Sequence, residues 1–208
     1  MGKSSIERPW RPTRAQLLAA KDKLVPDVAK PGLTLLLVGI NPGLYTAAIG
    51  HHFGRPGNRF WPALHRAGVT PRELSPFEEG ELLSLGIGVT NVVPRATATA
   101  DELTRDEIVA GGKALDRKVR RLAPRAVAVL GIGTYRTAYA RPKAALGPQP
   151  ETVGGRPVWV LPNPSGLNAH FSLDALAAQV RAMWAWAKEV HRGGAEGREG
   201  NLATDGHG

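Results

Sequence analysis

Two segments that lie far apart in this chain each combine an asparagine–proline step with a glycine directly after an apolar run. They are Gly39-Ile-Asn-Pro-Gly-Leu44 and Leu161-Pro-Asn-Pro-Ser-Gly-Leu167. Proline removes a backbone donor and glycine lets the backbone turn sharply or approach a ligand, so such a loop holds a fixed shape with its amides exposed. An asparagine amide can orient water or bind a polar ligand, although it is not a strong base. We expect both loops to belong to one active site; a purely structural turn is the alternative for each loop taken alone.

The elements that must position these loops follow from the spacing of apolar residues. Short apolar runs predict strands over residues 33–38, 86–93, 126–130 and 158–161. Helical spacing predicts helices over residues 13–24, 58–67, 76–85, 104–122, 134–140 and 172–190. Thr13 is a plausible N-cap, and Thr104 with Glu107 forms a capping box. The alternation of strands and helices predicts an α/β fold with a mainly parallel sheet covered on both faces.

The length and composition fit one domain with two tails. The chain has 208 residues, of which 42% are hydrophobic, enough for a real core. We expect a flexible basic arm over residues 1–12, a single domain over residues 13–190, and a disordered glycine-rich tail over residues 191–208. With no cysteine and no metal-ligand spacing among six histidines, we expect neither a metal ion nor another cofactor.

The charge indicates a polyanionic partner. A net charge of +9 favours binding to phosphates, because clustered lysines and arginines release counterions from them. No apolar stretch approaches the roughly 20 residues that span a bilayer, and the first 30 residues lack the apolar core of a signal peptide. We therefore expect a cytoplasmic protein whose partner is a nucleic acid and not a membrane.

Five motifs in order carry a resemblance to a known family. They are Gly39 to Gly43, Gly-His-His-Phe at residues 50–53, Pro-Gly-Asn-Arg-Phe-Trp at residues 56–61, Gly-Val-Thr-Asn at residues 88–91, and Asn-Pro-Ser-Gly-Leu at residues 163–167. Together they resemble the mismatch-specific uracil-DNA glycosylase and thymine-DNA glycosylase family. The resemblance implies a three-layer α/β/α fold with a short, mainly parallel sheet. It also implies a monomeric, monofunctional glycosylase that removes uracil opposite guanine in double-stranded DNA.

The resemblance assigns the water to the first loop. Cleavage of an N-glycosidic bond builds oxocarbenium character on the sugar, and a water must attack it. By its position in the motif, Asn41 would hold that water, and Thr97 matches a position where the family can add a hydroxyl. Asp101 is the nearest acidic residue after the strand over residues 86–93, and it is a candidate general base. The alternative is that Asp101 only lies near a helix N-terminus, where the dipole favours a carboxylate.

Other residues of the resemblance would form the base pocket. Phe53 matches the aromatic residue that stacks on the flipped base, with a core phenylalanine as the alternative. The backbone near Ile40 and the side chain of Asn91 are candidate donors to the pyrimidine. Thr46 would lie beside the 5-position and disfavour thymine relative to uracil. Asn163, at the start of the second loop, is assigned to the substrate.

The second loop matches the segment that the family inserts into DNA. Its predicted DNA contacts are Ser165, Gly166, Leu167, Asn168 and His170. Leu167 would fill the space of the flipped base, although it could instead fold back onto the last helix. The usual Ser-Arg pair after this leucine is absent, so the residue that reads the opposite guanine stays open.

Three arginines near the motifs, Arg55, Arg59 and Arg95, are candidate phosphate contacts or ordinary surface charges.

The placement of lysines predicts that the protein does not cleave the DNA strand. Strand cleavage needs an amine nucleophile, and no lysine occurs between Gly39 and Leu103 or between Glu151 and Val180. A catalytically inactive module that binds DNA lesions is one alternative. A nucleotide-cofactor enzyme is another, because Gly131-Ile-Gly after a strand resembles an incomplete dinucleotide fingerprint.

Overall fold

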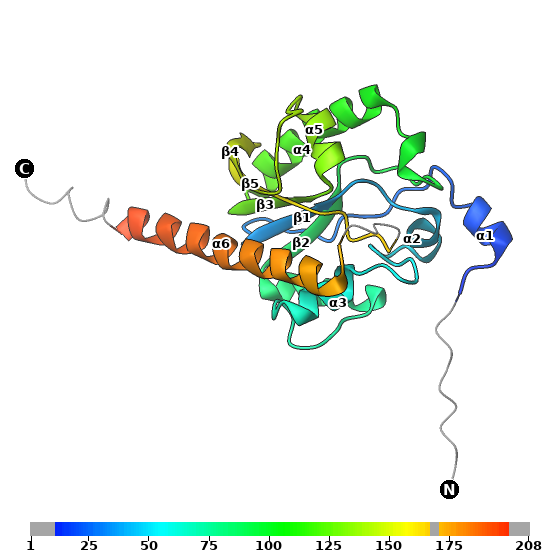
Figure 1. The fold of residues 1–208 in the computed structure, drawn as a ribbon, viewed down its shortest axis with the longest axis horizontal. Coiled ribbons are helices and arrows are strands. Elements are labelled where there is room, and N and C mark those ends of the chain that lie inside the picture. The colour runs from blue at the N-terminus through cyan, green and yellow to red at the C-terminus, as the bar shows by residue number, and fades with distance from the viewer. Residues whose placement is uncertain (1–10, 167–170, 200–208) are drawn as a thin grey trace, which may run out of the picture.

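The central element is a five-stranded sheet with strand order β2-β1-β3-β5-β4 (Figure 1). A computed structural model describes residues 11–166 and 171–199, with side chains described as far as residue 190. The strands are β1 (Leu35–Gly39), β2 (Ile87–Asn91), β3 (Ala126–Leu130), β4 (Gly147–Val153) and β5 (Arg156–Leu161). All neighbouring pairs are parallel except β4 with β5, so the predicted α/β fold with a mainly parallel sheet is confirmed.

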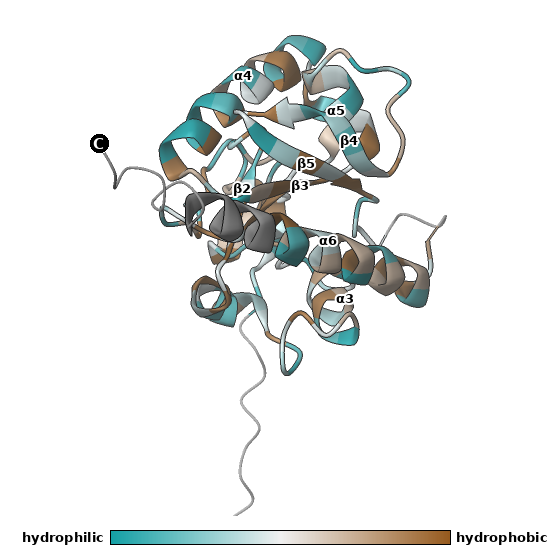
Figure 2. Ribbon diagram, turned by 90° about the vertical axis from the view of Figure 1, so that its left-hand side faces the viewer, coloured by the Kyte–Doolittle hydropathy of each residue, from teal (hydrophilic) through white to brown (hydrophobic). Residues whose placement is uncertain are grey.

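Helices cover both faces of the sheet, which gives three layers (Figure 2). On one face α3 (Phe60–Arg66) and α6 (Leu173–Glu199) pack against alternate strand residues such as Leu35 and Leu37. On the other face α4 (Arg105–Leu122) and α5 (Ile132–Ala138) pack against the residues between them, Leu36 and Val38. Because both faces are buried, every residue of β1 is buried, and this explains the continuous apolar run in the sequence.

The remaining short elements lie beside this frame. They are α1 (Arg14–Leu18), α2 (Leu44–Ile49) and two 3₁₀ helices, η1 (Pro76–Leu85) and η2 (Ala100–Glu102). The carboxyl ends of the four parallel strands meet at one edge of the sheet. Both asparagine–proline loops follow strands at this edge, so the topology places them together as predicted.

The boundaries of several helices differ from the prediction. Helix α1 begins after Thr13, as predicted, but it ends at Leu18 and not at residue 24. The segment over residues 76–85 is a 3₁₀ helix. Helix α6 continues to Glu199, past the predicted end at residue 190, so the helix covers the first half of the segment predicted as a disordered tail. A helix that packing has already fixed extends at low cost, and no proline stops this one.

Three elements were absent from the prediction, namely β4, α2 and the three-residue helix η2. Strand β4 contains Pro148 and Pro150, and proline is tolerated only because β4 is an edge strand whose exposed and buried residues alternate. Helix α2 has only six residues, too few for a helical period to stand out.

Candidate active site

A cleft of about 450 Å³ opens at the carboxyl edge of the sheet, between the first and second loops. Its lining includes every residue that the sequence assigned to catalysis or to the substrate, together with two of the predicted DNA contacts. These are Ile40, Asn41, Thr46, Phe53, Arg55, Asn91, Thr97, Asp101, Asn163 and Ser165. The predicted site residues therefore converge on one cavity, although they come from segments separated by more than a hundred residues.

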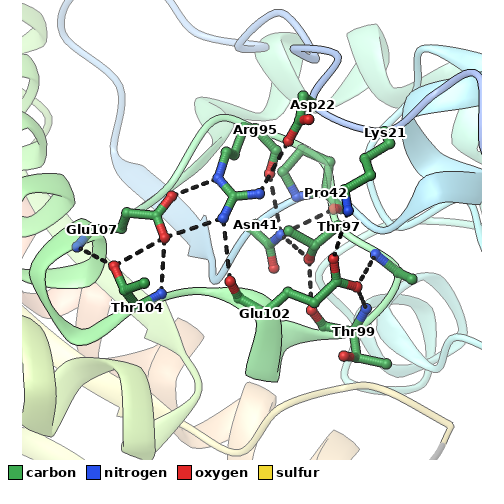
Figure 3. Close-up of polar contacts among 11 residues, drawn as sticks. Lys21, Asp22, Asn41, Pro42, Arg95, Thr97, Thr99, Glu102, Thr104 and Glu107 are labelled. Carbon is green, nitrogen blue, oxygen red and sulfur yellow. Dashed lines mark hydrogen bonds and ion pairs between the residues drawn. The ribbon is translucent and has the colours of Figure 1, made fainter.

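The amide of Asn41 is held in one orientation. Its Nδ2 lies 3.1 Å from the carbonyl oxygen of Arg95, 3.2 Å from that of Pro42 and 2.7 Å from Oγ1 of Thr97 (Figure 3). Carbonyl oxygens only accept hydrogen bonds, so the atom that faces them is the amide nitrogen. Oδ1 of Asn41 is then the atom that remains available as an acceptor in the cleft.

The hydroxyl of Thr97 helps to hold the amide of Asn41 in this orientation. It donates to the carbonyl oxygen of Thr99 at 2.7 Å, so its proton is already used and it accepts from Asn41. Its side chain is 1% exposed. Thr97 thus helps to orient Asn41, and its predicted contact with the water stays a prediction.

Asn91 lies across the cleft at the end of β2 and is fixed by His52. Nε2 of His52 lies 2.9 Å from the carbonyl oxygen of Pro26, so this nitrogen carries the proton. In the neutral ring Nδ1 is then an acceptor, and Nδ2 of Asn91 donates to it at 3.4 Å. A Cβ on Gly39 would lie 2.5 Å from Oδ1 of Asn91, so only glycine at the end of β1 leaves room for this amide.

Burial keeps His52 neutral. Desolvation lowers its pKa below the ordinary 6.5, although the carbonyl of Pro26 and the charge of Glu79 act in the opposite direction. Glu79 also holds the loop, because it accepts from the backbone amide of His52 at 2.7 Å and lies 2.9 Å from Nδ1 of His51. His52 lines the cleft, and the sequence analysis missed its role. The signal was its place directly before Phe53 in the second motif.

Phe53 packs against the core, which was one of the two alternatives, and stacking on a flipped base stays a prediction. Its ring stacks on Phe60 of α3, with centroids 3.8 Å apart and planes at 16°, and it also lines the cleft. Its φ of 53° is in the left-handed region, which an aromatic residue rarely adopts, so the loop holds it in a strained conformation.

Thr46, which is 5% exposed, accepts from the backbone amide of Gly54, so it fastens the same turn besides lining the cleft.

Asp101 lies in η2 at the rim of the cleft and is exposed. The capping role at the start of η2 belongs to Glu102, whose carboxylate accepts from the backbone amides of Ala98 and Thr99. Within the described residues Asp101 makes no hydrogen bond, so its carboxylate is not committed to the protein frame. Asp101 and Glu102 both lie in the first turn of η2, so the position of Asp101 also fits the alternative of a carboxylate near a helix N-terminus.

Arg95 is a structural residue. Its Nε lies 2.5 Å from Oε1 of Glu107 and its Nη1 lies 3.1 Å from Oδ1 of Asp22, as Figure 3 shows. These ion pairs connect α4 and the segment after α1 to the loop whose carbonyl holds Asn41. The arginine also lowers the pKa of Glu107 to about 2. The sequence offered Arg95 as a candidate phosphate contact or an ordinary surface charge. A side chain used in these ion pairs is poorly placed to contact phosphates.

The second loop is described as far as Gly166. Oδ1 of Asn163 accepts from the backbone amide of Ser165 at 3.0 Å, which closes a tight turn. Gly166 lines a smaller pocket of about 250 Å³ together with Arg55. The predicted contacts Leu167, Asn168 and His170 lie outside the described residues.

The guanidinium of Arg59 faces the protein. It donates to the carbonyl oxygens of Ser165 and Phe171. Arg55 is exposed and lines the cleft, in contrast to Arg59 and Arg95, whose side chains bind protein groups.

Among the described residues, no group of three metal-ligating side chains could hold an ion. No helix in this part of the chain has the length and apolar character needed to cross a membrane.

Comparison with known proteins identifies the family. A model of the uracil DNA glycosylase superfamily matches residues 26–188, which include all five strands and both loops. A solution NMR structure from Methanosarcina acetivorans, of a protein provisionally assigned as a uracil DNA glycosylase, is similar to this chain in fold. The TM-score is 0.50 and the identity is 18%, over 77% of this chain and 96% of that chain. With the superfamily model matching most of its length, the chain belongs to the uracil DNA glycosylase superfamily, a membership that supports a DNA glycosylase function.

Proposed function

We propose that this protein is a monofunctional DNA glycosylase of base excision repair that flips uracil out of G·U pairs in double-stranded DNA and removes it by hydrolysis. The observation that carries the proposal is the fixed amide of Asn41, whose Oδ1 is left to accept a hydrogen bond in the cleft. A water that donates to this oxygen keeps its lone pairs free to attack the sugar carbon. We also expect the protein to act as a monomer in the cytoplasm.

The opposite side of the cleft fits a pyrimidine. Uracil presents an N–H donor between two carbonyl acceptors, and the amide of Asn91 offers both an acceptor and a donor. Phe53 offers an aromatic face for stacking. Thr46 lines the cleft, and its bulk would favour uracil over thymine. No lysine is among the described residues that line the cleft, and this favours hydrolysis over Schiff-base chemistry.

The second loop would separate the bases. It stands at the mouth of the same cleft through Asn163 and Ser165. An apolar side chain that follows, Leu167, would occupy the space that the flipped uracil leaves in the duplex.

A labelled duplex with one G·U pair tests the function. Wild-type protein should create an alkali-labile site under single-turnover conditions, and Asn41→Ala should not. Gln149→Ala is a matched control, because this amide lies on the edge strand β4 and contacts only the carbonyls of Ala145 and Gly147. Faster cleavage of G·U than of G·T is expected. Binding without cleavage by wild-type protein would instead favour an inactive lesion-binding module, and a borohydride-trapped adduct would contradict simple hydrolysis.

Asp101 is the proposed general base, because asparagine cannot take the proton of the water. Asp101→Asn should lower the single-turnover rate on G·U by about a hundredfold, which is the lower range for loss of general-base catalysis. Asp106→Asn is the control, since Asp106 is exposed in the first turn of α4 and does not line the cleft. Unchanged cleavage by Asp101→Asn would remove this role.

A further inference from the structure

The residues around Arg59 connect the base pocket with the second loop. Arg59 is the N-cap residue of α3. Its backbone amide donates to the carbonyl of Pro164 at 3.0 Å, and its Nη2 donates to the carbonyl of Ser165 at 2.6 Å. Its Nη1 donates to the carbonyl of Phe171. One residue therefore binds backbone on both sides of residues 166–170.

The start of α3 also supports the floor of the cleft. Phe60, the next residue, is 3% exposed and stacks on Phe53. Oδ1 of Asn58 accepts from the backbone amide of Phe60 at 2.9 Å. The three consecutive residues 58–60 thus contact both the wall of the cleft and the second loop.

The second loop also touches the segment of residues 55–58 through the backbone. A Cβ on Gly166 would lie 2.5 Å from the carbonyl oxygen of Gly57, so a larger residue at position 166 would push the loops apart. The contact leaves little freedom for the second loop to move relative to residues 55–58.

We propose that Arg59 is a positioning residue that keeps the second loop in register with the base pocket while the loop separates the bases, and that it does not serve as a phosphate contact. The inference rests on the proposed function. Unstacking a base has an energetic cost that the inserted segment must support, so a loop that can retreat flips the base less well. The planar guanidinium binds two carbonyls in a fixed geometry, which the single ammonium of lysine cannot reproduce.

Arg59→Lys tests the role because it conserves the charge. The substrate is a G·U duplex with 2-aminopurine beside the uracil, and the readouts are the fluorescence rise on unstacking and the single-turnover cleavage rate. Both should fall about tenfold or more, because hydrogen bonds to a charged group are lost. Cleavage of uracil left unpaired in a bulge should stay within about twofold of wild type, since no pair has to be opened. Arg66→Lys is the matched control on the same helix, where Arg66 pairs with Asp174.

Salt dependence separates positioning from phosphate binding. The variant for this test is Arg59→Gln, which removes the charge that Arg59→Lys keeps. For a positioning residue its slope of log K against log salt should match wild type, whereas loss of one phosphate contact lowers the magnitude of the slope by about 0.9. A lowered slope, wild-type rates on G·U, or equal losses on paired and bulged uracil would each overturn the inference. If Arg59→Lys does not fold, Gly166→Ala displaces the same loop with Arg59 intact and should give the same pattern. If wild-type protein leaves uracil uncut in both substrates, the proposed function itself has failed.

Discussion

On its Nδ2 side Asn41 meets three oxygen atoms, the carbonyls of Pro42 and Arg95 and the hydroxyl of Thr97. An amide that could rotate would present either a donor or an acceptor to the cleft, and only an acceptor leaves the lone pairs of a bound water free. The proposed water-binding role of Asn41 would therefore depend on the groups that orient its amide. Sequence motifs identified Asn41 itself, but two of the three partners that orient it, Arg95 and Thr97, come from a loop more than fifty residues away.

Thr97→Val tests whether the orientation of Asn41 depends on the hydroxyl of Thr97. Valine keeps the shape of threonine but removes the hydroxyl, so Asn41 loses its shortest hydrogen bond, 2.7 Å. We expect the single-turnover rate on G·U to fall about tenfold with little change in DNA affinity, because misorientation affects the reacting water more than the duplex. Thr70→Val is the control, since the buried hydroxyl of Thr70 has no hydrogen-bond partner in the described part of the chain. A loss of affinity without a loss of rate would contradict the assignment.

His52 predicts a pH dependence of stability. Burial lowers its pKa in the folded state below 6.5, whereas the unfolded chain titrates near 6.5. Between these two values the unfolded state binds more protons, so the free energy of unfolding falls as the pH drops below 6.5. The slope cannot exceed about 1.4 kcal/mol per pH unit for one group. Urea unfolding of His52→Gln should show a flatter profile in this window. His65→Gln, on the exposed side of α3, serves as the control.

At the scale of elements, apolar runs and capping residues predicted those strands and helices whose formation depends on nearby residues. Strand β3 matches its prediction residue for residue, because burial on both faces requires a continuous apolar run. Helix α4 begins directly after its N-cap Thr104, whose capping box is visible in the sequence. Strand β4 could not be predicted, since it exists through pairing with β5 and its two prolines argue against a strand. The ion pairs of Arg95 were equally hidden, because they depend on the packing of α4 beside a distant loop.

The ion pair that joins α4 to the loop containing Arg95 can be tested through Glu107. Arg95 and the backbone amide of Thr104 hold the pKa of Glu107 at about 2 in the folded state, below its ordinary 4.5. This stabilisation is complete above about pH 4.5 and is lost as the pH falls toward 2. Glu107→Gln keeps the capping acceptor but removes the charge, so its urea midpoint should fall less steeply than that of wild type between these pH values. An exposed carboxylate, Glu73, provides the Glu73→Gln control. Identical acid profiles for wild type and Glu107→Gln would contradict the pairing.

At the scale of the molecule, the parallel topology explains why the site could be predicted at all. Parallel strands deliver their carboxyl ends to one edge, so motifs that are scattered in the sequence meet in one cleft. The roles of the arginines could not be predicted in the same way, because a net charge of +9 does not show which arginines are available to DNA. Arg59 and Arg95 bind protein groups, while Arg55 stays exposed at the cleft. Only the folded arrangement separates these roles.

The salt dependence of DNA binding should reflect that division. Arg55→Gln removes a cation beside the cleft, so the slope of log K against log salt should lose about 0.9 in magnitude, and the affinities of variant and wild type should converge at high salt. Arg72→Gln is the control with the same loss of charge, since Arg72 already pairs with Glu78 at 2.9 Å and with Glu81 at 2.7 Å outside the cleft. Equal slopes for the two variants would mean that net charge, and not the position of Arg55, governs binding. A change confined to Arg55→Gln would place the path of the duplex across the carboxyl edge of the sheet.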